Sequence, residues 1–437
     1  MTDLVIHGAT VVTSTSLGLA DIAVTDGRIS AVGTNLDVDA SERIDASGLH
    51  VFPGGIDSHV HFNEPGRTEW ETIANGSAAL AAGGYTTFID MPLNNLPVTT
   101  DGPAFDLKLT AAKRSSLIDF GFWAGLVPGN LGHLETLHAR GALGFKAFMC
   151  PSGIDEFPAC DEKTLRDGMK RIAELDSILL VHAEAPELLQ PLSGPGWKDF
   201  VLSRPPEAEW TAIEQAVGLA AETGCRLHVV HVSTPHGFEM ISEAQEHGID
   251  VSGESCPHYL LYADSDLEWL GGIGKCAPPL RSRQFRDSLR RMLVHGQIPM
   301  VVSDHSPSTL DLKSGSDFSA IWGGISGCQS TRPLLLAHEG LDLQLLAGLT
   351  SMNVARRFRL KGKGDITSGF DADLWIVDLG HTDVVRSEDL LYHNPFSPHE
   401  GQPVRGRTVR TLVRGKTVFA PGQAQPGSAG RLVTPTV

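Results

Sequence analysis

Short apolar runs alternate with amphipathic stretches through the middle of the chain. Continuous apolar runs are typical of strands that are buried on both faces, as in a parallel sheet. The patterns of residues 164–175 and 209–223 predict helices between such strands. Eight strands are predicted, over residues 51–62, 86–91, 119–126, 144–149, 178–182, 226–232, 249–255 and 300–303. This alternation favours an α/β fold with a closed (β/α)8 TIM-like barrel over an open doubly wound sheet, because no Gly-x-Gly-x-x-Gly turn opens a helix.

The two ends of the chain show a different pattern. The first 50 residues consist of short alternating strands joined by tight turns, including Asp26-Gly27, a strong hairpin signal. Similar strands return in residues 372–378 and 409–418. We therefore predict a small β-sandwich domain built from residues 1–52 and 366–437, and a barrel domain over residues 53–365. The tail from Pro421 is rich in Pro, Gly, Ala and Gln, and we expect it to fray.

Length and composition narrow the classes of function. A chain of 437 residues suits one large barrel with a smaller companion. The net charge of −17 argues against nucleic-acid binding, because no basic stripe is available to neutralise phosphates. No stretch approaches the length needed to span a bilayer, and the six scattered cysteines form no Cys-x-x-Cys pair. We expect a soluble cytoplasmic protein that acts on a small molecule.

A pair of histidines, His59 and His61, is the strongest chemical signal in the chain. Residues two apart on a strand point to the same face, so both imidazoles can hold one cation. Single histidines end two later strands, at His182 and His231, and Asp304 ends another. The carboxyl ends of the strands meet at one face of a β/α barrel. The sequence therefore predicts a metal centre at that face.

Three neighbouring residues have more open roles. Asp57 shares the face of the histidine pair but lies deeper, and we expect it to orient a histidine rather than to bind metal. His228 and His231 are three residues apart and face opposite sides of a strand. We expect His231 to be the ligand and His228 to pack against a helix. His305 is equally compatible with a functional and a structural role.

Lys146 lies inside an apolar strand, where burial disfavours the ammonium and lowers its pKa. The neutral amine can add CO2 to form an N6-carboxylated lysine, an anion able to bridge two metals roughly 3.5–4 Å apart. The charges favour this interpretation, because two divalent cations held by four imidazoles and one aspartate lack a second anion. The alternative is a lysine that extends to the barrel rim. Imidazole and carboxylate ligands suit zinc, our first expectation, and also cobalt, iron, nickel or manganese.

A carboxylate at the position of Asp304 can take a proton from a metal-bound water and pass it to a leaving nitrogen. A mechanism based on a serine or cysteine nucleophile has no support. No Gly-x-Ser-x-Gly is present, and none of the cysteines lies in a recognisable nucleophile signature.

The chain closely resembles the cyclic amidohydrolases of the amidohydrolase superfamily, which are the dihydroorotases, hydantoinases and allantoinases. The resemblance extends nearly end to end, and within the group it is greatest to the allantoinases. It rests on residues 59–71, 90–94, 146–153, 254–260, 275–279, 303–307, 322–327 and 350–356. It implies that a hydroxide bridging two metals attacks a ring amide of allantoin, while Asp304 shuttles the proton and allantoate is formed. It also implies a homotetramer.

Two departures separate the subfamilies. Dihydroorotases carry an arginine that grips the substrate carboxylate at the position of Asn63, and a neutral amide cannot make that bidentate charged pair. Hydantoinases carry a tyrosine that supports the oxyanion a few residues after the lysine, where this chain has Cys150-Pro151-Ser152-Gly153. Both differences fit a neutral ring with a ureido group. The resemblance also implies substrate contacts at Cys276, Ala277, Ser306 and Gly323, beside Asn63, Cys150 and Ser152.

Two other functions remain as alternatives. The first is another cyclic amidase, of the hydantoinase or dihydropyrimidinase type, which a panel of substrates would separate. The second is an inactive scaffold with the same fold. Inactive relatives have lost metal ligands, whereas all six predicted ligands are present in this chain.

Overall fold

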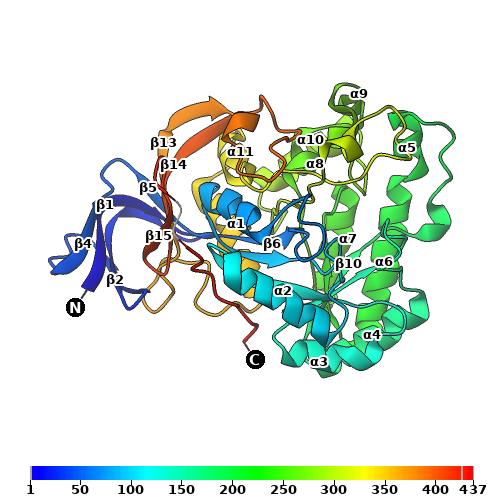
Figure 1. The fold of residues 1–437 in the computed structure, drawn as a ribbon, viewed down its shortest axis with the longest axis horizontal. Coiled ribbons are helices and arrows are strands. Elements are labelled where there is room, and N and C mark those ends of the chain that lie inside the picture. Colours follow the sequence, from blue (N-terminus) through cyan, green and yellow to red (C-terminus); the bar gives the residue numbers. More distant parts are fainter. Residues whose placement is uncertain (1, 425–426, 437) are drawn as a thin grey trace.

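The computed structural model describes residues 2–424 and 427–436. Figure 1 shows a helix-rich part built around parallel strands, and beside it a strand-rich part. The first strands of the chain, in blue, lie there next to the last strands, in orange and red. Among the residues that the structure describes, no helix is both long and apolar enough to cross a membrane.

Seven parallel strands form the sheet of the helix-rich part, each next to its neighbour in sequence. Their residues are almost entirely buried, which explains the continuous apolar runs. The strands are β6 (Gly55–Val60), β7 (Tyr85–Asp90), β8 (Asp119–Gly125), β9 (Gly144–Phe148), β10 (Ile178–His182), β11 (Arg226–Val229) and β12 (Val251–Gly253). The predicted parallel sheet is therefore confirmed.

The eighth predicted strand, residues 300–303, is not a regular strand. Val301 makes a parallel bridge to Ser255 after β12, and His305 makes one to Val60 of β6. These bridges join the two edges of the curled sheet through a short irregular segment. Asp304 lies within it at a φ of 46°, which interrupts the extended conformation.

Helices follow the strands and cover the sheet (Figure 1). The two predicted helices are found as α4 and α6. Side-chain caps explain several helix starts, because Thr72, Asp101 and Asp161 each accept a hydrogen bond from the main chain three residues later. The longer helices are α1 (Ile73–Ala82), α2 (Gly102–Ser115), α4 (Glu162–Glu174), α6 (Pro206–Thr223), α7 (Pro235–Glu246) and α10 (Arg283–Val294). The shorter ones are α3 (Leu134–Ala139), α5 (Trp197–Ser203), α8 (Pro257–Leu261), α9 (Leu267–Leu270), α11 (Thr331–Ala337), α12 (Leu343–Ala347) and α13 (Asn353–Arg357).

Both ends of the chain contribute to one eight-stranded sheet. Its order is β15-β14-β13-β5-β1-β2-β3, with β4 paired to β1. The predicted hairpin joins β2 to β3, with positive φ at both Asp26 and Gly27. The strands are β1 (Thr2–Val12), β2 (Leu17–Thr25), β3 (Arg28–Gly33), β4 (Ala40–Asp45), β5 (His50–Pro53), β13 (Leu374–Val384), β14 (Pro403–Val413) and β15 (Lys416–Phe419).

The division of the first predicted strand and the order of the tail both differ from the prediction. The single strand expected over residues 51–62 is divided at Gly54, so that β5 joins the terminal sheet and β6 the parallel one. A Cβ at Gly54 would lie 2.1 Å from Oγ1 of Thr86, so the chain can pass there only as glycine. We expected the tail to fray, and this prediction is wrong for its last described residues. The main chain of Phe120 forms hydrogen bonds with the main chain of Arg431 and Val433. Met1, Gln425, Pro426 and Val437 lie outside the described residues.

Candidate active site

The side chains predicted as metal ligands converge at the carboxyl ends of the parallel strands. All of them line one cavity of about 410 Å³. They come from β6, β9 and β10, from the segment after β11, and from the irregular segment after residue 300. The six residues are His59, His61, Lys146, His182, His231 and Asp304.

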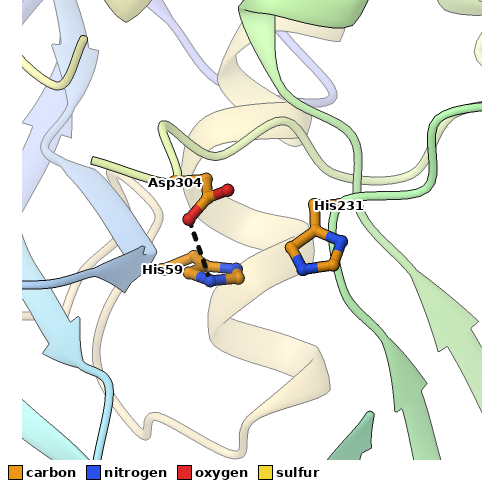
Figure 2. A group of neighbouring side chains, drawn as sticks. All are labelled: His59, His231 and Asp304. Atoms are coloured by element: carbon orange, nitrogen blue, oxygen red, sulfur yellow. Dashed lines mark ion pairs between the residues drawn. The ribbon is translucent and has the colours of Figure 1, made fainter. Parts of the chain in front are cut away.

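His59, His231 and Asp304 lie close together (Figure 2), with potential ligand atoms within 4.8 Å of one another. Nε2 of His59 lies 3.2 Å from Oδ1 of Asp304, and Nε2 of His61 lies 3.6 Å from the same oxygen. His231 and Asp304 both have positive φ, at 39° and 46°. Such backbone strain in residues other than glycine is concentrated at functional sites.

His182 and His231 form a second pair of nitrogen donors. Nε2 of His182 donates to Oε2 of Glu184 at 2.7 Å, which leaves the Nδ1 lone pair free. That Nδ1 lies 3.1 Å from Nε2 of His231, so the two nitrogens face one point. Burial lowers the pKa of both histidines, which favours the neutral form that binds metal.

Lys146 lies between these groups with an unsatisfied amine. Its Nζ is buried and makes no hydrogen bond, and it lies 5.1 Å from the centre of the Phe148 ring. Burial lowers the pKa of Lys146 to about 7. A buried ammonium without a partner is costly, and the lowered pKa increases the share of the neutral amine, which is the form that can add CO2. The donor set and this amine fit a group of two divalent cations joined by a carbamate.

Glu254 is a functional candidate that the sequence reasoning missed. Its Oε1 accepts from Nδ1 of His59 at 2.7 Å, and its Oε2 lies 3.1 Å from Nε2 of His228. Burial acts to raise the pKa of Glu254, but the charge of His228 and the hydrogen bonds from His228 and His59 hold it at about 2. A carboxylate one residue after β12 lies at a strand end, so the rule that selected Asp304 also points to it.

Asp57 contacts the main chain of His59 rather than its ring, so the orienting contact expected of it is made by Glu254 instead. Its Oδ1 accepts from the main-chain N–H groups of His59 and Ser303, at 3.2 and 3.3 Å, rather than from an imidazole. Burial raises the pKa of Asp57 to about 7. Asp57 lies within β6 and contacts the main chain, whereas Glu254, directly after β12, contacts the ring of His59.

The other two histidines lie outside the cavity lining. His228 has its ring 5.2 Å from that of Phe358, directly after α13, as expected of a residue that packs against a helix. It also bonds Oγ of Ser252, at 2.7 Å. His305 is fully buried, with Nε2 3.4 Å from Oε2 of Glu71 and Nδ1 accepting from the N–H of Gly327. These contacts give His305 a structural role.

Glu184 and Arg204 support the second pair of donors and were also missed. Arg204 donates to Glu184 through Nε at 3.0 Å and through Nη2 at 2.5 Å. Burial acts to raise the pKa of Glu184, but the charge of Arg204 and the hydrogen bond from His182 hold it well below its usual range. The carboxylate therefore stays ionised and fixes the ring of His182.

Five of the predicted substrate contacts line the cavity, namely Ser152, Cys276, Ala277, Ser306 and Gly323. Asn63 and Cys150 do not. Asn63 is buried and donates through Nδ2 to the carbonyl of Pro307, at 3.3 Å. The thiol of Cys150 is buried 3.6 Å from Nη2 of Arg204. Further lining residues that the sequence reasoning did not select are Asn94, Phe148, Phe200, Arg204, Lys275 and Trp322.

Comparison with known proteins places this geometry in a family. Residues 50–418 match the amidohydrolase family. The chain is 50% identical to an allantoinase from Rubrobacter xylanophilus, covering 99% of this chain and 98% of that protein. It is 46% identical to an allantoinase from Solibacter usitatus, covering 100% and 97%. The solved structure of an L-hydantoinase (dihydropyrimidinase) from Arthrobacter aurescens superposes with a TM-score of 0.96 at 34% identity, covering 99% of this chain and 100% of that one. The chain therefore belongs to the amidohydrolase family.

Proposed function

We propose that this protein hydrolyses a ring amide of allantoin and so forms allantoate. The observation that carries the proposal is the convergence of four histidines, one aspartate and an unpartnered lysine in one cavity of about 410 Å³. Support for the substrate comes from the two allantoinases to which the chain is 50% and 46% identical over nearly its whole length.

The proposed cofactor is a pair of divalent metal ions, zinc first, with cobalt, iron, nickel and manganese as alternatives. His59 and His61 would hold one ion, and His182 and His231 the other. Lys146, carboxylated on Nζ, would serve both ions. Two ions bound there would lower the pKa of a water molecule and polarise the amide carbonyl.

Asp304 is the proposed proton carrier. Burial acts to raise its pKa, but the charge of His59 and the contact with His61 hold the pKa well below its usual range. The carboxylate is therefore ionised and can accept a proton from the attacking water. Delivery of that proton to the leaving ring nitrogen completes hydrolysis, because the amine then departs neutral.

The charges around the cavity favour a neutral ring over a carboxylated one. Apart from Lys146, two cations line the cavity, and both are already engaged. Arg204 donates to Glu184, while Nζ of Lys275 donates to the carbonyls of Phe318 and Ile321. Among the described residues, a substrate carboxylate would meet no free cationic side chain in the cavity other than Lys146, whereas the carbonyls and N–H groups of a ureido ring can use the polar lining.

The test is the ratio of kcat/KM for allantoin and dihydroorotate, with hydantoin and dihydrouracil added, in one metal-loaded preparation. Loss of a desolvated charge pair worth roughly 2–4 kcal/mol predicts a preference of about 30- to 1000-fold for allantoin. A ratio near one, or one in favour of dihydroorotate, overturns the substrate assignment. A preference for hydantoin or dihydrouracil would establish the second candidate, a hydantoinase or dihydropyrimidinase, which the TM-score of 0.96 to the L-hydantoinase favours.

Assembly, location and domains complete the proposal. We infer a homotetramer, for which sedimentation should give four chains per particle. The six cysteines are all free and buried, which supports a reducing compartment such as the cytoplasm. The shared terminal sheet supports one small domain built from residues 1–52 and 366–437, for which we propose a β-sandwich, beside a barrel domain over residues 53–365.

A further inference from the structure

One wall of the cavity is formed by irregular backbone. Residues 319–324 all line the cavity, yet residues 314–324 contain neither a helix nor a strand. A wall without a hydrogen-bond ladder needs other contacts to keep its shape. Two buried lysines supply them.

Lys313 lies at the end of a 3-10 turn (Leu310–Lys313), directly before this wall. Its Nζ donates to the carbonyls of Lys275, at 3.3 Å, and Trp322, at 2.9 Å, and also to that of Gly324. Nζ of Lys275 donates to the carbonyls of Phe318 and Ile321. The two side chains thus gather five carbonyls, four of which belong to the wall.

The charge state of Lys313 follows from this count. Burial lowers its pKa to about 7. An ammonium carries three N–H donors, which match the three carbonyls, whereas a neutral amine would turn its lone pair toward one of them. Among the described residues, no ion pair joins Lys275 or Lys313 to a carboxylate. Main-chain carbonyls solvate both charges, and the ring of Phe200 lies 4.9 Å from Nζ of Lys275.

Burial of a charge without a counter-ion is energetically unfavourable. Lys363 shows the usual arrangement, because its Nζ lies 2.6 Å from Asp373 and 3.0 Å from Asp371. The hydrogen bonds to the five carbonyls offset the cost of burying the charges of Lys275 and Lys313, and these bonds form only while the wall keeps this conformation. Two other contacts involve the turn that precedes the wall. The N–H of Trp322 donates to the carbonyl of Leu312, and a Cβ at Gly272 would lie 2.2 Å from the carbonyl oxygen of Lys313. Loss of the lysine donors would therefore loosen residues 318–324 without detaching them from the turn that precedes them.

We propose that Lys275 and Lys313 are positioning residues that hold residues 318–324 in the shape that closes the substrate cavity, and so set the affinity for the ring substrate. This inference rests on the proposed function. Without the lysine donors the wall populates open conformations, and each binding event has to order it again. The cost falls on binding rather than on the metal-dependent step.

The test compares Lys313→Met and Lys275→Met with Lys363→Met as the matched control. The three lysines are similarly buried, with exposed fractions of 3%, 8% and 6%. We expect Lys313→Met and Lys275→Met to keep the metal content and a similar kcat while KM for allantoin rises about 10- to 100-fold. Lys363→Met should lower the melting temperature and leave KM unchanged. Lys313→Arg, which keeps the donors, should restore part of the affinity.

A second measurement does not depend on turnover. Hydrogen exchange in the metal-loaded protein should be faster in residues 314–324 of Lys313→Met and Lys275→Met, and unchanged there in Lys363→Met. Unchanged KM in both variants, or unchanged exchange in this segment, overturns the inference. Failure of the unmodified protein to hydrolyse allantoin would instead overturn the proposed function, while the exchange result still decides whether the lysines hold the wall.

Discussion

Oε1 of Glu254 lies 2.7 Å from Nδ1 of His59, and both side chains are almost fully buried. This bond fixes the tautomer of His59, because Nδ1 must carry the proton, and leaves Nε2 free to face Asp304. Contacts of this kind raise the basicity of a metal-bound imidazole. The proposed metal centre thus depends on a residue that binds no metal itself.

Glu254→Gln should lower metal affinity about 10- to 100-fold, since a neutral amide accepts a weaker hydrogen bond from His59. Competition with a chelator measures the change. Asp57→Asn is the control, because the amide oxygen still accepts from the main chain of His59. Equal losses in the two variants would show that the contact with the ring of His59 has no special importance.

His231→Asn and His228→Asn test which histidine of the strand binds metal. His231 lines the cavity and faces His182, so its replacement should remove bound metal and abolish activity. His228 lies behind the strand against Phe358, and its replacement should leave the metal content largely intact. Metal analysis of the purified variants decides. Loss of metal only in His228→Asn would contradict the proposed ligand set.

Lys146→Ala removes the proposed carbamate. We expect loss of metal and a fall in kcat of more than about 100-fold, because the metal-supported step contributes several kcal/mol. Short-chain carboxylic acids with bicarbonate should partly restore both. The intact mass of the unmodified protein in bicarbonate buffer should exceed that of the amine form by one CO2. A free amine beside two bound ions would rule out the carbamate.

His399 predicts a dependence of stability on pH. Burial, together with the charge of His258, lowers its pKa to about 3, whereas an unfolded histidine titrates near 6.5. The unfolded chain therefore binds the proton more readily. Neutral His399 therefore contributes fully to the free energy of unfolding above about pH 6.5. This contribution is lost progressively as the pH falls toward 3, by about 2 kcal/mol at pH 5.

His399→Gln should make the protein less sensitive to acid over that range. The melting temperature of the unmodified protein should fall more between pH 7 and pH 5 than that of the variant. His381 lies in the exposed last part of β13 and is the control position, and His381→Gln should reproduce the pH profile of the unmodified protein. If the melting temperatures of the unmodified protein and of His399→Gln changed equally with pH, His399 would have the same pKa in the folded and unfolded chain.

The positions of the proposed metal ligands could be predicted because the rules behind them act over a few residues. His59 and His61 share a face because side chains alternate along a strand. His182 lies at the carboxyl end of the apolar run that forms β10. The apolar residues of each strand bury it in the parallel sheet, and this brings the carboxyl ends of the strands together. All three histidines line the cavity at that end.

Residues whose roles depend on distant partners escaped prediction. Glu254 is 195 positions away from His59, so no local pattern joins them. Asn63 and Cys150 were selected by the resemblance, yet both are buried outside the cavity lining. Lys275 and Lys313 act on main-chain carbonyls of a wall without regular structure, which leaves no periodic signal.

The amino-acid pattern alone was enough for the alternation of strands and helices and for the strands at both ends, because the burial of each apolar run is encoded in the run itself. Only the tertiary structure decided how the sheet closes through Val301 and His305, and where Gly54 divides one predicted strand between two sheets. The same holds for residues 431–433, which form main-chain hydrogen bonds with Phe120. A main-chain group accepts whichever partner the folded chain brings near it, and that choice depends on segments far away in the sequence.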